Sequence, residues 1–400
     1  MSAILAGANA RIPVTVLTGF LGSGKTTLLN RLVRDPAMAR ALVIINEFGS
    51  IGLDHDLIAR STDDLVVEMV SGCLCCTIRG DLSRTLVDAP WRFARDGQCW
   101  FDRVVIETTG LADPAPILHT LMADERLAPL YRLDGIVATV DAATGMGTLD
   151  RQPESLKQAA VADRLLLTKT DLVGAAPVRQ LERRLRALNP AAPILHVIDG
   201  NVPPSEILDA GLWNAETKTD DVQRWLKLEA YSEGHHRDDD HHHPQPDGHG
   251  DPHDHGHDHG HSHDPNRHGD DIHAVCLTFD DPLDATAFER WIDLLTMFKG
   301  PDILRMKGIL NLAGAPRPLV VHGVQHVFHP PVELDAWPSE DRRTRLVFIT
   351  RGIDAGTLRG TLAMLTLGME RFDIASGITG LSTVTGPEDP MRFQLGPERR

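Results

Sequence analysis

The first half of the chain alternates short apolar runs with segments of helical periodicity. The apolar runs that predict strands are Val14–Leu17, Ala41–Ile45, Leu65–Met69, Arg103–Ile106, Gly135–Val140, Arg164–Leu167 and Ile194–Val197. The segments between them that predict helices are Thr26–Arg34, Leu82–Phe93, Ser155–Val161 and Pro177–Leu188. Near-continuous apolar strands that alternate with helices predict a mostly parallel sheet covered on both faces.

Beyond residue 271 the order of the elements changes. The pattern predicts strands at His273–Phe279, Ile303–Leu312, Pro318–His322 and Arg345–Ile349. It predicts helices at Ala285–Leu295 and Ala355–Leu365. This order is typical of a small α+β domain with an antiparallel sheet.

A histidine-rich segment separates the two regions. Thirteen of the 20 histidines lie between His235 and His268, and ten aspartates against two arginines give residues 235–271 a local charge of about −8. With almost no apolar residues, this segment cannot bury enough surface to offset its conformational entropy. The predicted units are a domain at 1–232, a disordered linker at 233–271, a domain at 272–370 and a loosely ordered tail at 371–400. The alternating imidazoles at 255–263 also suit weak capture of Zn²⁺, Ni²⁺, Co²⁺ or Cu²⁺.

Composition narrows the class of protein. The chain has 400 residues, 42% of them hydrophobic, which is enough for sizeable cores and excludes a wholly disordered chain. No apolar run is long enough to span a membrane, and the N-terminus lacks a signal-peptide core, so we expect a cytoplasmic protein. The net charge of −16 argues against a general nucleic-acid or anionic-membrane binder. Self-association as a homodimer is compatible with the sequence.

The first predicted strand runs directly into Gly19-Phe20-Leu21-Gly22-Ser23-Gly24-Lys25-Thr26-Thr27. This is the G-x-x-x-x-G-K-[ST] pattern, with the strand before it and the helix after it that the pattern requires. The glycines let backbone N–H groups turn toward phosphate, and the helix N-terminus adds a favourable dipole. We expect Lys25 to reach the β- and γ-phosphates and the Thr26 hydroxyl to ligate Mg²⁺. The predicted nucleotide-binding residues of this loop are Gly22, Ser23, Gly24, Lys25, Thr26 and Thr27.

The loop and the hydrophobic pattern together predict the fold class. We expect an α/β phosphate-loop NTPase domain with a mostly parallel sheet, followed by a small α+β domain with an antiparallel sheet. The alternative for the loop alone is a chance glycine-rich turn.

The identity of the base is predicted by Thr168-Lys169-Thr170-Asp171, which follows a strand. The spacing matches the N-K-x-D element of GTPases, with Thr168 in place of Asn. A carboxylate at Asp171 can accept both the N1–H and the N2–H₂ of guanine, whereas adenine would leave it unpaired. The Lys169 stem can lie over the base, and Thr168 is expected to forgo one base hydrogen bond. The alternative for Asp171 is a helix N-cap.

A carboxylate follows the neighbouring strand in Glu107-Thr108-Thr109-Gly110. Glu107 suits a contact in the outer shell of Mg²⁺ or the orientation of a water molecule, and Gly110 can donate its N–H to the γ-phosphate. An ordinary strand-end acid is the alternative. Because no glutamine stands beside this element to place the attacking water, we expect slow intrinsic hydrolysis. The predicted catalytic residues are therefore Lys25, Thr26 and Glu107.

Three of the five cysteines lie within four positions, in Gly72-Cys73-Leu74-Cys75-Cys76. A trio of thiolates suits Zn²⁺ or Cu⁺, and three sulfurs leave a tetrahedral ion one ligand short, as at an exchangeable site. Buried structural cysteines or a redox pair are the alternatives. Cys99 and Cys276 are interpreted as core residues. The histidines of the second domain, His322, His326 and His329, are interpreted as surface strand residues rather than ligands.

These elements together resemble the CobW-type metallochaperone GTPases over roughly residues 12–370. The matching segments are Gly19–Thr27, Asn46-Glu47-Phe48-Gly49, Gly72–Cys76, Glu107–Gly110 with Ala112-Asp113-Pro114, and Thr168–Asp171. The joint occurrence of the phosphate loop and the C-x-C-C element carries most of the resemblance. Ser50 departs from the family, because many relatives carry an acid there.

The resemblance implies binding of GTP, Mg²⁺ and a transition metal, usually Zn²⁺ and in some branches Co²⁺, which is handed to a client metalloprotein. It implies that Cys73, Cys75 and Cys76 hold the metal and that Glu47 lies near both sites. The leading hypothesis is a GTP-hydrolysing zinc metallochaperone in which hydrolysis gates release. The alternatives are a metal buffer or storage protein with regulatory nucleotide binding, and a cobalt-directed chaperone of cobalamin synthesis. Asp171 and the lack of an evident acceptor pocket disfavour an ATP-dependent metabolite kinase.

Overall fold

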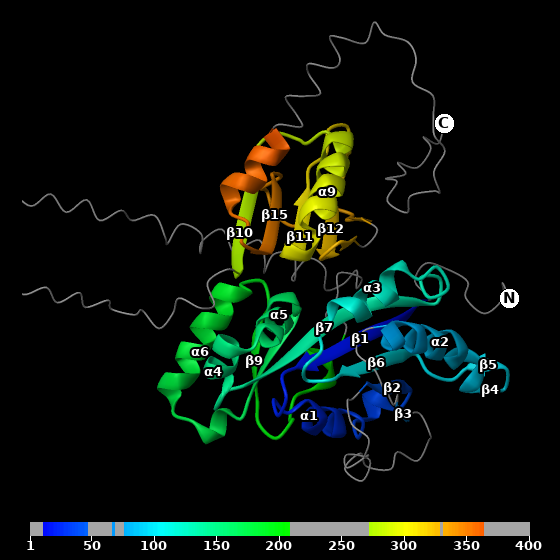
Figure 1. The fold of residues 1–400 in the computed structure, drawn as a ribbon. Helices are drawn as coiled ribbons and strands as arrows, with labels where there is room; N and C mark the ends of the chain where they lie inside the picture. The colour runs from blue at the N-terminus through cyan, green and yellow to red at the C-terminus, as the bar shows by residue number, and fades with distance from the viewer. Residues whose placement is uncertain (1–10, 47–65, 69–75, 209–271, 329–330, 364–400) are drawn as a thin grey trace, which may run out of the picture.

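The computed structural model describes residues 11–46, 66–68, 76–208, 272–328 and 331–363, which form two packed units (Figure 1). The predicted domain boundaries at 232, 271 and 370 fall outside the described residues and stay predictions. Within the described part, none of the helices is long and apolar enough to cross a lipid bilayer.

A seven-stranded parallel sheet forms the centre of the first unit as the structure describes it. Its strand order is β3-β2-β6-β1-β7-β8-β9, and each neighbouring pair is parallel. The strands are β1 (Ile12–Gly19), β2 (Ala41–Asn46), β3 (Val66–Glu68), β6 (Arg103–Thr108), β7 (Tyr131–Asp141), β8 (Arg164–Thr168) and β9 (Ile194–Val197). The predicted strands and the parallel sheet are therefore confirmed.

Helices cover both faces of this sheet. They are α1 (Lys25–Leu32), α2 (Cys76–Arg92), α3 (Ala115–Ala123), α4 (Gly145–Arg151), α5 (Pro153–Val161) and α6 (Ala175–Leu188). Short elements complete the unit: β4 (Ala94–Arg95), β5 (Gln98–Cys99), η2 (Pro36–Met38), η3 (Thr170–Leu172) and η4 (Pro204–Glu206). Alternate residues of β6 divide between the faces: Val104 and Ile106 pack with the core under α2, α3, α5 and α6, and Val105 packs with the core under α1.

Two of these helices were not predicted from the sequence. α3 carries almost no polar face, and its buried residues include Ile117, Leu118 and Leu121. It lies between the parallel sheet and the second unit, so apolar residues are favoured on both of its sides. Its sequence therefore shows no amphipathic period. α4 is short and contains Gly145 and Gly147, which lower the helix propensity that a sequence pattern reports.

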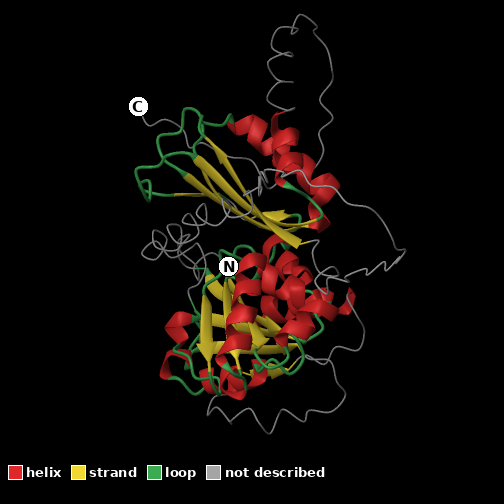
Figure 2. Cartoon of the chain, turned by 90° about the vertical axis from the view of Figure 1, so that its left-hand side faces the viewer, coloured by secondary structure: helices red, strands yellow, loops and turns green. Residues whose placement is uncertain are grey.

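The second unit is an antiparallel sheet with helices on its outer face (Figure 2). Its strands follow the order β10-β15-β11-β12-β13, with β14 also paired to β12. Their bounds are β10 (Ile272–Phe279), β11 (Ile303–Leu310), β12 (Leu319–Val324), β13 (Val327–Phe328), β14 (Val332–Glu333) and β15 (Thr344–Arg351). The outer helices are α9 (Ala285–Lys299) and residues 355–363, and η6 (Gly300–Asp302) follows α9. Trp291 of α9 packs against Phe288 and against Phe348 of β15 in the core of this unit.

The inner face of the antiparallel sheet packs on α3, α5 and α6 of the first unit (Figures 1 and 2). Leu304, Val324 and Ile349 of this face join the hydrophobic core of the first unit. At its edge the rings of His119 on α3 and His326 have centroids 5.0 Å apart. The two units therefore share one continuous apolar interface.

A cluster of charged groups is buried in this interface. Asp163, which precedes β8, pairs with Arg305, and its Oδ1 lies 3.0 Å from Lys307 Nζ. Arg305 Nη2 lies 3.1 Å from His322 Nε2, and Arg305 can only donate, so His322 accepts as a neutral ring. His322 is only 8% exposed, so its interpretation as a surface strand residue is wrong. The strand turns this ring inward, toward a charge supplied by the other unit.

Candidate functional site

The carboxyl ends of the central strands β1, β6, β7 and β8 meet at one edge of the parallel sheet. Strand register places Gly19 opposite Thr139, and Leu17 opposite Glu107. The same register places Asp141 opposite Thr168 at the next pair of strands. In open parallel sheets, ligands bind in the crevice outside this edge. The predicted phosphate loop and the predicted base element are thus brought together.

The phosphate loop has the backbone shape that its glycines predict. A Cβ on Gly19 would lie 2.2 Å from Thr139 Oγ1 and 2.5 Å from the Thr139 carbonyl oxygen, so only glycine fits between β1 and β7. Gly24 has φ 94° and is the N-cap of α1, which begins at Lys25. The N-terminal N–H groups of α1 consequently lie directly after the loop, where a phosphate can accept them.

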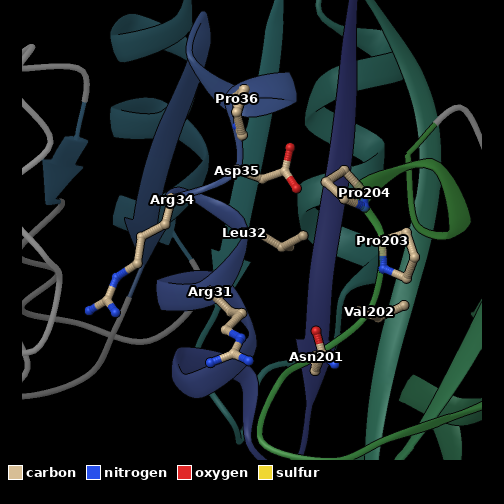
Figure 3. A pocket seen from close by; sticks show the side chains of 9 residues that line it. All are labelled: Arg31, Leu32, Arg34, Asp35, Pro36, Asn201, Val202, Pro203 and Pro204. Atoms are coloured by element: carbon tan, nitrogen blue, oxygen red, sulfur yellow. The ribbon is translucent and has the colours of Figure 1, made fainter.

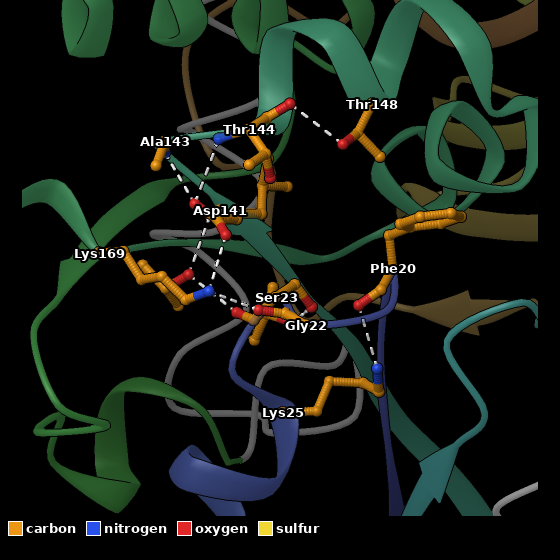
Figure 4. Close-up of polar contacts among 12 residues, drawn as sticks. Phe20, Gly22, Ser23, Lys25, Asp141, Ala143, Thr144, Thr148 and Lys169 are labelled. Carbon is orange, nitrogen blue, oxygen red and sulfur yellow. Dashed lines mark hydrogen bonds and ion pairs between the residues drawn. The ribbon is translucent and has the colours of Figure 1, made fainter. Parts of the chain in front are cut away.

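Polar side chains fasten this loop to its neighbours (Figure 4). Lys25 Nζ donates to the carbonyl oxygens of Gly19 at 2.8 Å and Phe20 at 3.2 Å. The hydroxyls of Ser23 and Thr139 are 2.6 Å apart. The Lys25 ammonium therefore lies inside the curve of the loop, and Thr27 lies exposed beyond it on α1.

Thr26 and Glu107 are in contact across the sheet edge. Thr26 Oγ1 donates to Glu107 Oε1 at 3.1 Å, and Glu107 is only 3% exposed. A hydroxyl and a carboxylate are the hard oxygen donors that Mg²⁺ prefers. The donor chemistry of this pair fits the predicted Mg²⁺ contact.

The base element is attached to the phosphate loop (Figure 4). Lys169 has φ 57°, and its Nζ donates to the Gly22 carbonyl oxygen at 2.7 Å and to Asp141 Oδ2 at 2.8 Å. Thr168 Oγ1 donates to the Ser23 carbonyl oxygen at 2.8 Å. Thr168 thus has a structural role in holding the phosphate loop, in addition to the base hydrogen bond that it is expected to lose relative to Asn. Asp171 lies in η3 with an exposed side chain, accessible to a ligand.

The segment after Glu107 contacts both the phosphate loop and α5. A Cβ on Gly110 would lie 2.6 Å from the backbone nitrogen of Leu21, so the two loops touch through backbone atoms. Gln158 of α5 donates to the carbonyl oxygens of Gly110 and Ala112. The sequence reasoning found no glutamine next to this element along the chain, but the fold places one against it.

The sequence reasoning missed three residues that the fold brings to this edge: Thr139, Asp141 and Gln158. Asp141 accepts from the backbone N–H groups of Ala143 and Thr144 as well as from Lys169. A signal existed for it, because Asp141 ends a buried strand in the same way as Glu107. Thr139 and Gln158 carry no such signal, since each is a buried polar residue inside a regular element.

The predicted transition-metal ligands cannot be placed. Glu47, Cys73, Cys75, His329 and the histidine-rich linker lie outside the described residues. Cys76 is described only as the first residue of α2. Among the residues that the structure describes, no group of three or more His, Cys, Asp or Glu side chains could hold a metal ion. Cys99 and Cys276 are half-buried and pack against apolar clusters of the first and the second unit, as expected.

A separate pocket lies at the far end of α1 (Figure 3). Its volume is about 620 Å³, and its lining residues are Arg31, Leu32, Arg34, Asp35, Pro36, Asn201, Val202, Pro203 and Pro204. None of the predicted site residues lines it. The predicted chemistry belongs to the sheet edge instead.

The chain matches known proteins along most of its length. Residues 13–196 match the family described as CobW/HypB/UreG, nucleotide-binding domain, and residues 272–366 match the cobalamin synthesis protein cobW C-terminal domain. The chain is 31% identical over 355 residues to the zinc chaperone YjiA of Escherichia coli (strain K12), an alignment that covers 88% of this chain and 98% of the relative. It is 28% identical over 387 residues to the zinc chaperone CobW of a Sinorhizobium species, covering 89% and 98%.

A solved structure agrees with the sequence matches. The crystal structure of Zn(II)-bound YjiA GTPase from E. coli is similar with a TM-score of 0.60 and 27% identity, covering 89% of this chain and 99% of that one. The resemblance inferred from the phosphate loop and the cysteine cluster is confirmed. The chain belongs to the CobW family, with a CobW/HypB/UreG nucleotide-binding domain followed by a CobW C-terminal domain.

Proposed function

We propose that this protein is a GTPase that binds Zn²⁺ and delivers it to a client protein, with hydrolysis gating the release. One observation supports the enzymatic part above all. The phosphate loop, the Thr26–Glu107 pair and the Lys169–Asp171 element meet at one sheet edge. A protein that only stores metal has no need of a base-selective, Mg²⁺-competent nucleotide site.

Each of these residues has a separate role in the proposed reaction. Lys25 neutralises charge on the β- and γ-phosphates, and α1 presents its N-terminal N–H groups to them. Thr26 and Glu107 would hold Mg²⁺, which supplies electrostatic stabilisation of the phosphate oxygens when bound. Gly110 donates its N–H toward the γ-phosphate, and Asp171 selects guanine. The carboxylate of Asp141 keeps Lys169 in place beside the base.

Asp171→Asn is expected to weaken GTP binding several-fold to about a hundredfold, a loss of about 1–3 kcal/mol. The substitution turns one of two acceptors into a donor, which then faces the N–H groups of guanine. Xanthosine triphosphate carries an oxygen at position 2, so its binding is expected to improve. Titration of both nucleotides measures the exchange of preference.

Asp88→Asn serves as the matched control for this substitution, because Asp88 is an exposed acid on α2. It removes the same charge at a distance from the sheet edge and should leave both affinities unchanged. Unchanged GTP affinity in Asp171→Asn would remove Asp171 from the base site.

Zinc delivery is supported by the family and by where the cysteine-rich segment joins the fold. The relatives named above are zinc chaperones, and one is a Zn(II)-bound GTPase. Cys76 begins α2, and α2 packs against α3, which continues the Glu107–Pro114 segment. Asn46, the residue before Glu47, ends β2 and pairs in register with Thr108 of β6. Both candidate metal segments are therefore connected to the proposed γ-phosphate loop.

Zinc affinity is expected to differ between the GTP and GDP states by about 5–150-fold, an ordinary coupling of 1–3 kcal/mol. Loops at this edge order around the γ-phosphate and relax after hydrolysis, and a small shift of one sulfur spoils tetrahedral geometry. The measurement is competition for Zn²⁺ against a chelator, first with a non-hydrolysable GTP analogue and then with GDP.

The comparison uses wild type, Cys75→Ser and Cys99→Ser. The first variant should abolish the nucleotide-dependent difference. Cys99→Ser should leave this difference intact, because Cys99 packs beside the core of the first unit. Equal zinc affinity in both nucleotide states of the wild type would refute hydrolysis-gated release and favour a metal buffer.

A further inference from the structure

Gln158 is a buried amide that attaches helix α5 to the loop after Glu107. Gln158 is only 1% exposed. Its Nε2 donates to the Gly110 carbonyl oxygen at 3.1 Å and to the Ala112 carbonyl oxygen at 2.9 Å. Both amide hydrogens are thus used on one short stretch of backbone. Lys157, the preceding residue, adds an ion pair of 2.8 Å to Asp113 Oδ2. Helix α5 therefore holds this loop at three points, Gly110, Ala112 and Asp113.

These bonds determine the orientation of the loop's peptide groups. Ala112 N–H donates to the Thr109 carbonyl oxygen at 3.0 Å, which closes a turn. In a trans peptide the N–H points opposite to the carbonyl, so this bond also sets the direction of the Gly110 N–H. Gln158 then fixes the next carbonyls along, at Gly110 and Ala112. The same turn touches the backbone of Leu21 in the phosphate loop.

Helix α5 is itself held firmly at its C-terminal end. Asn189 Nδ2 donates to the carbonyl oxygens of Ala159, Ala160 and Ala162. Arg305, from the C-terminal domain, donates to the Val161 carbonyl oxygen. The last carbonyl groups of a helix have no hydrogen-bond partner within the helix. Here the side chains of Asn189 and Arg305 contact all four carbonyl oxygens at this end. Gln158 therefore projects from a rigid support.

We propose that Gln158 is a positioning residue for GTP hydrolysis, acting through the Gly110–Ala112 turn on the γ-phosphate side of the site. This inference rests on the proposed GTPase function. It differs from the role of a glutamine that orients the attacking water, because this amide is spent on two carbonyl oxygens. Its effect on the reaction passes through the backbone N–H of Gly110.

The proposal predicts a selective loss. Gln158→Met keeps the volume and removes both hydrogen bonds, so the turn is free to shift. A misplacement of about 1 Å can lower a rate by about a hundredfold, and we expect kcat to fall about 10–100-fold. The affinity for a non-hydrolysable GTP analogue should fall with it. GDP lacks the γ-phosphate, so its affinity should change by less than about twofold, too little to count as a lost contact.

Tyr131→Phe is the matched control, because it also keeps the volume and removes a buried hydrogen bond. Tyr131 is equally buried at the start of β7, away from the carboxyl end of the sheet, and its hydroxyl donates to the Leu86 carbonyl oxygen at 2.7 Å. This substitution should lower the thermal midpoint while leaving the ratio of GTP-analogue to GDP affinity as in wild type. Lys157→Met, at a side chain 25% exposed, is a second variant whose folding is not at risk. It should shift the same ratio in the same direction, by less.

The experiment measures kcat, KM and the two nucleotide affinities in wild type and all three variants. A parallel loss of both affinities in Gln158→Met, no larger than expected from its loss of thermal stability as judged against Tyr131→Phe, would show a merely structural role. An unchanged kcat and ratio would overturn the proposal equally. Absence of GTP turnover in wild type would refute the proposed function instead, and the affinity ratio would still decide the role of Gln158.

Discussion

Asp163→Asn is expected to lower the free energy of unfolding by about 3–5 kcal/mol, the cost of breaking a buried ion pair on one side. The substitution keeps an oxygen that can accept the Ile136 N–H, now 3.0 Å from Asp163 Oδ2. It removes the negative charge that faces Arg305 and Lys307, which are 2% and 8% exposed. Two buried cations between the domains would then lose the carboxylate that faces them.

The same pair predicts a dependence on pH. Burial by itself raises the pKa of Asp163, but the attraction of Arg305 and Lys307 outweighs it, so the pKa lies well below its ordinary value. A carboxyl with a depressed folded-state pKa contributes its full stability above its unfolded pKa of about 3.9. That contribution is lost as the pH falls below about 4 toward the folded pKa. The difference in stability between wild type and Asp163→Asn should therefore shrink in acid.

Urea unfolding at neutral pH and at pH 4 and below measures both effects, and small-angle scattering reports whether the domains separate. Glu333→Gln is the control, because Glu333 pairs with Arg317 at 3.1 Å with both side chains about half exposed. Such surface pairs contribute about 0–1 kcal/mol. If Asp163→Asn cost no more than this control, the buried cluster would not hold the domains together.

Lys25→Met is expected to lower kcat/KM for GTP by about 10²–10³, the usual effect of removing one preorganised donor from a charged transition state. Lys25 is 7% exposed, and its ammonium group is held inside the phosphate loop by the carbonyl oxygens of Gly19 and Phe20. A phosphate oxygen in that position would receive the charge without a large movement of the side chain. Methionine retains the apolar stem and loses only the donor.

Steady-state GTP hydrolysis with Mg²⁺ tests this expectation. Arg31→Met is the control, because Arg31 is an exposed cation on the same helix that lines the pocket at its far end (Figure 3). The control should keep wild-type turnover. Hydrolysis by Lys25→Met at the wild-type rate would show that the phosphate loop is not the catalytic site.

The central strands β1, β6, β7 and β8 were recovered because they are buried on both faces and therefore mostly apolar. The phosphate loop and the Lys169 element were recovered because their spacing is dictated by the ligand rather than by packing. Boundaries were less accurate: α2 begins at Cys76, six residues before the predicted start at Leu82. The sequence of the first turn of α2, Cys76–Arg79, shows no apolar period that could predict this start.

The contacts between the domains could not be predicted. His322 lies on a strand whose other residues face an ordinary core, and only the docking of α5 turns its position into a buried charged site. In the sequence, nothing distinguishes Gln158 from any other polar residue in a short helix. Its function depends on a loop 46–48 positions away in sequence.

The sequence by itself determined the fold class and the family and predicted the nucleotide-contacting residues, because local spacing and hydrophobic period carry that information. Only the tertiary structure decided which polar side chains are buried and what they face. Burial depends on surfaces contributed by distant segments, and a buried donor or charge must find its partner there. Asp163, Arg305 and Gln158 acquire their roles in that way, between elements that no local pattern connects.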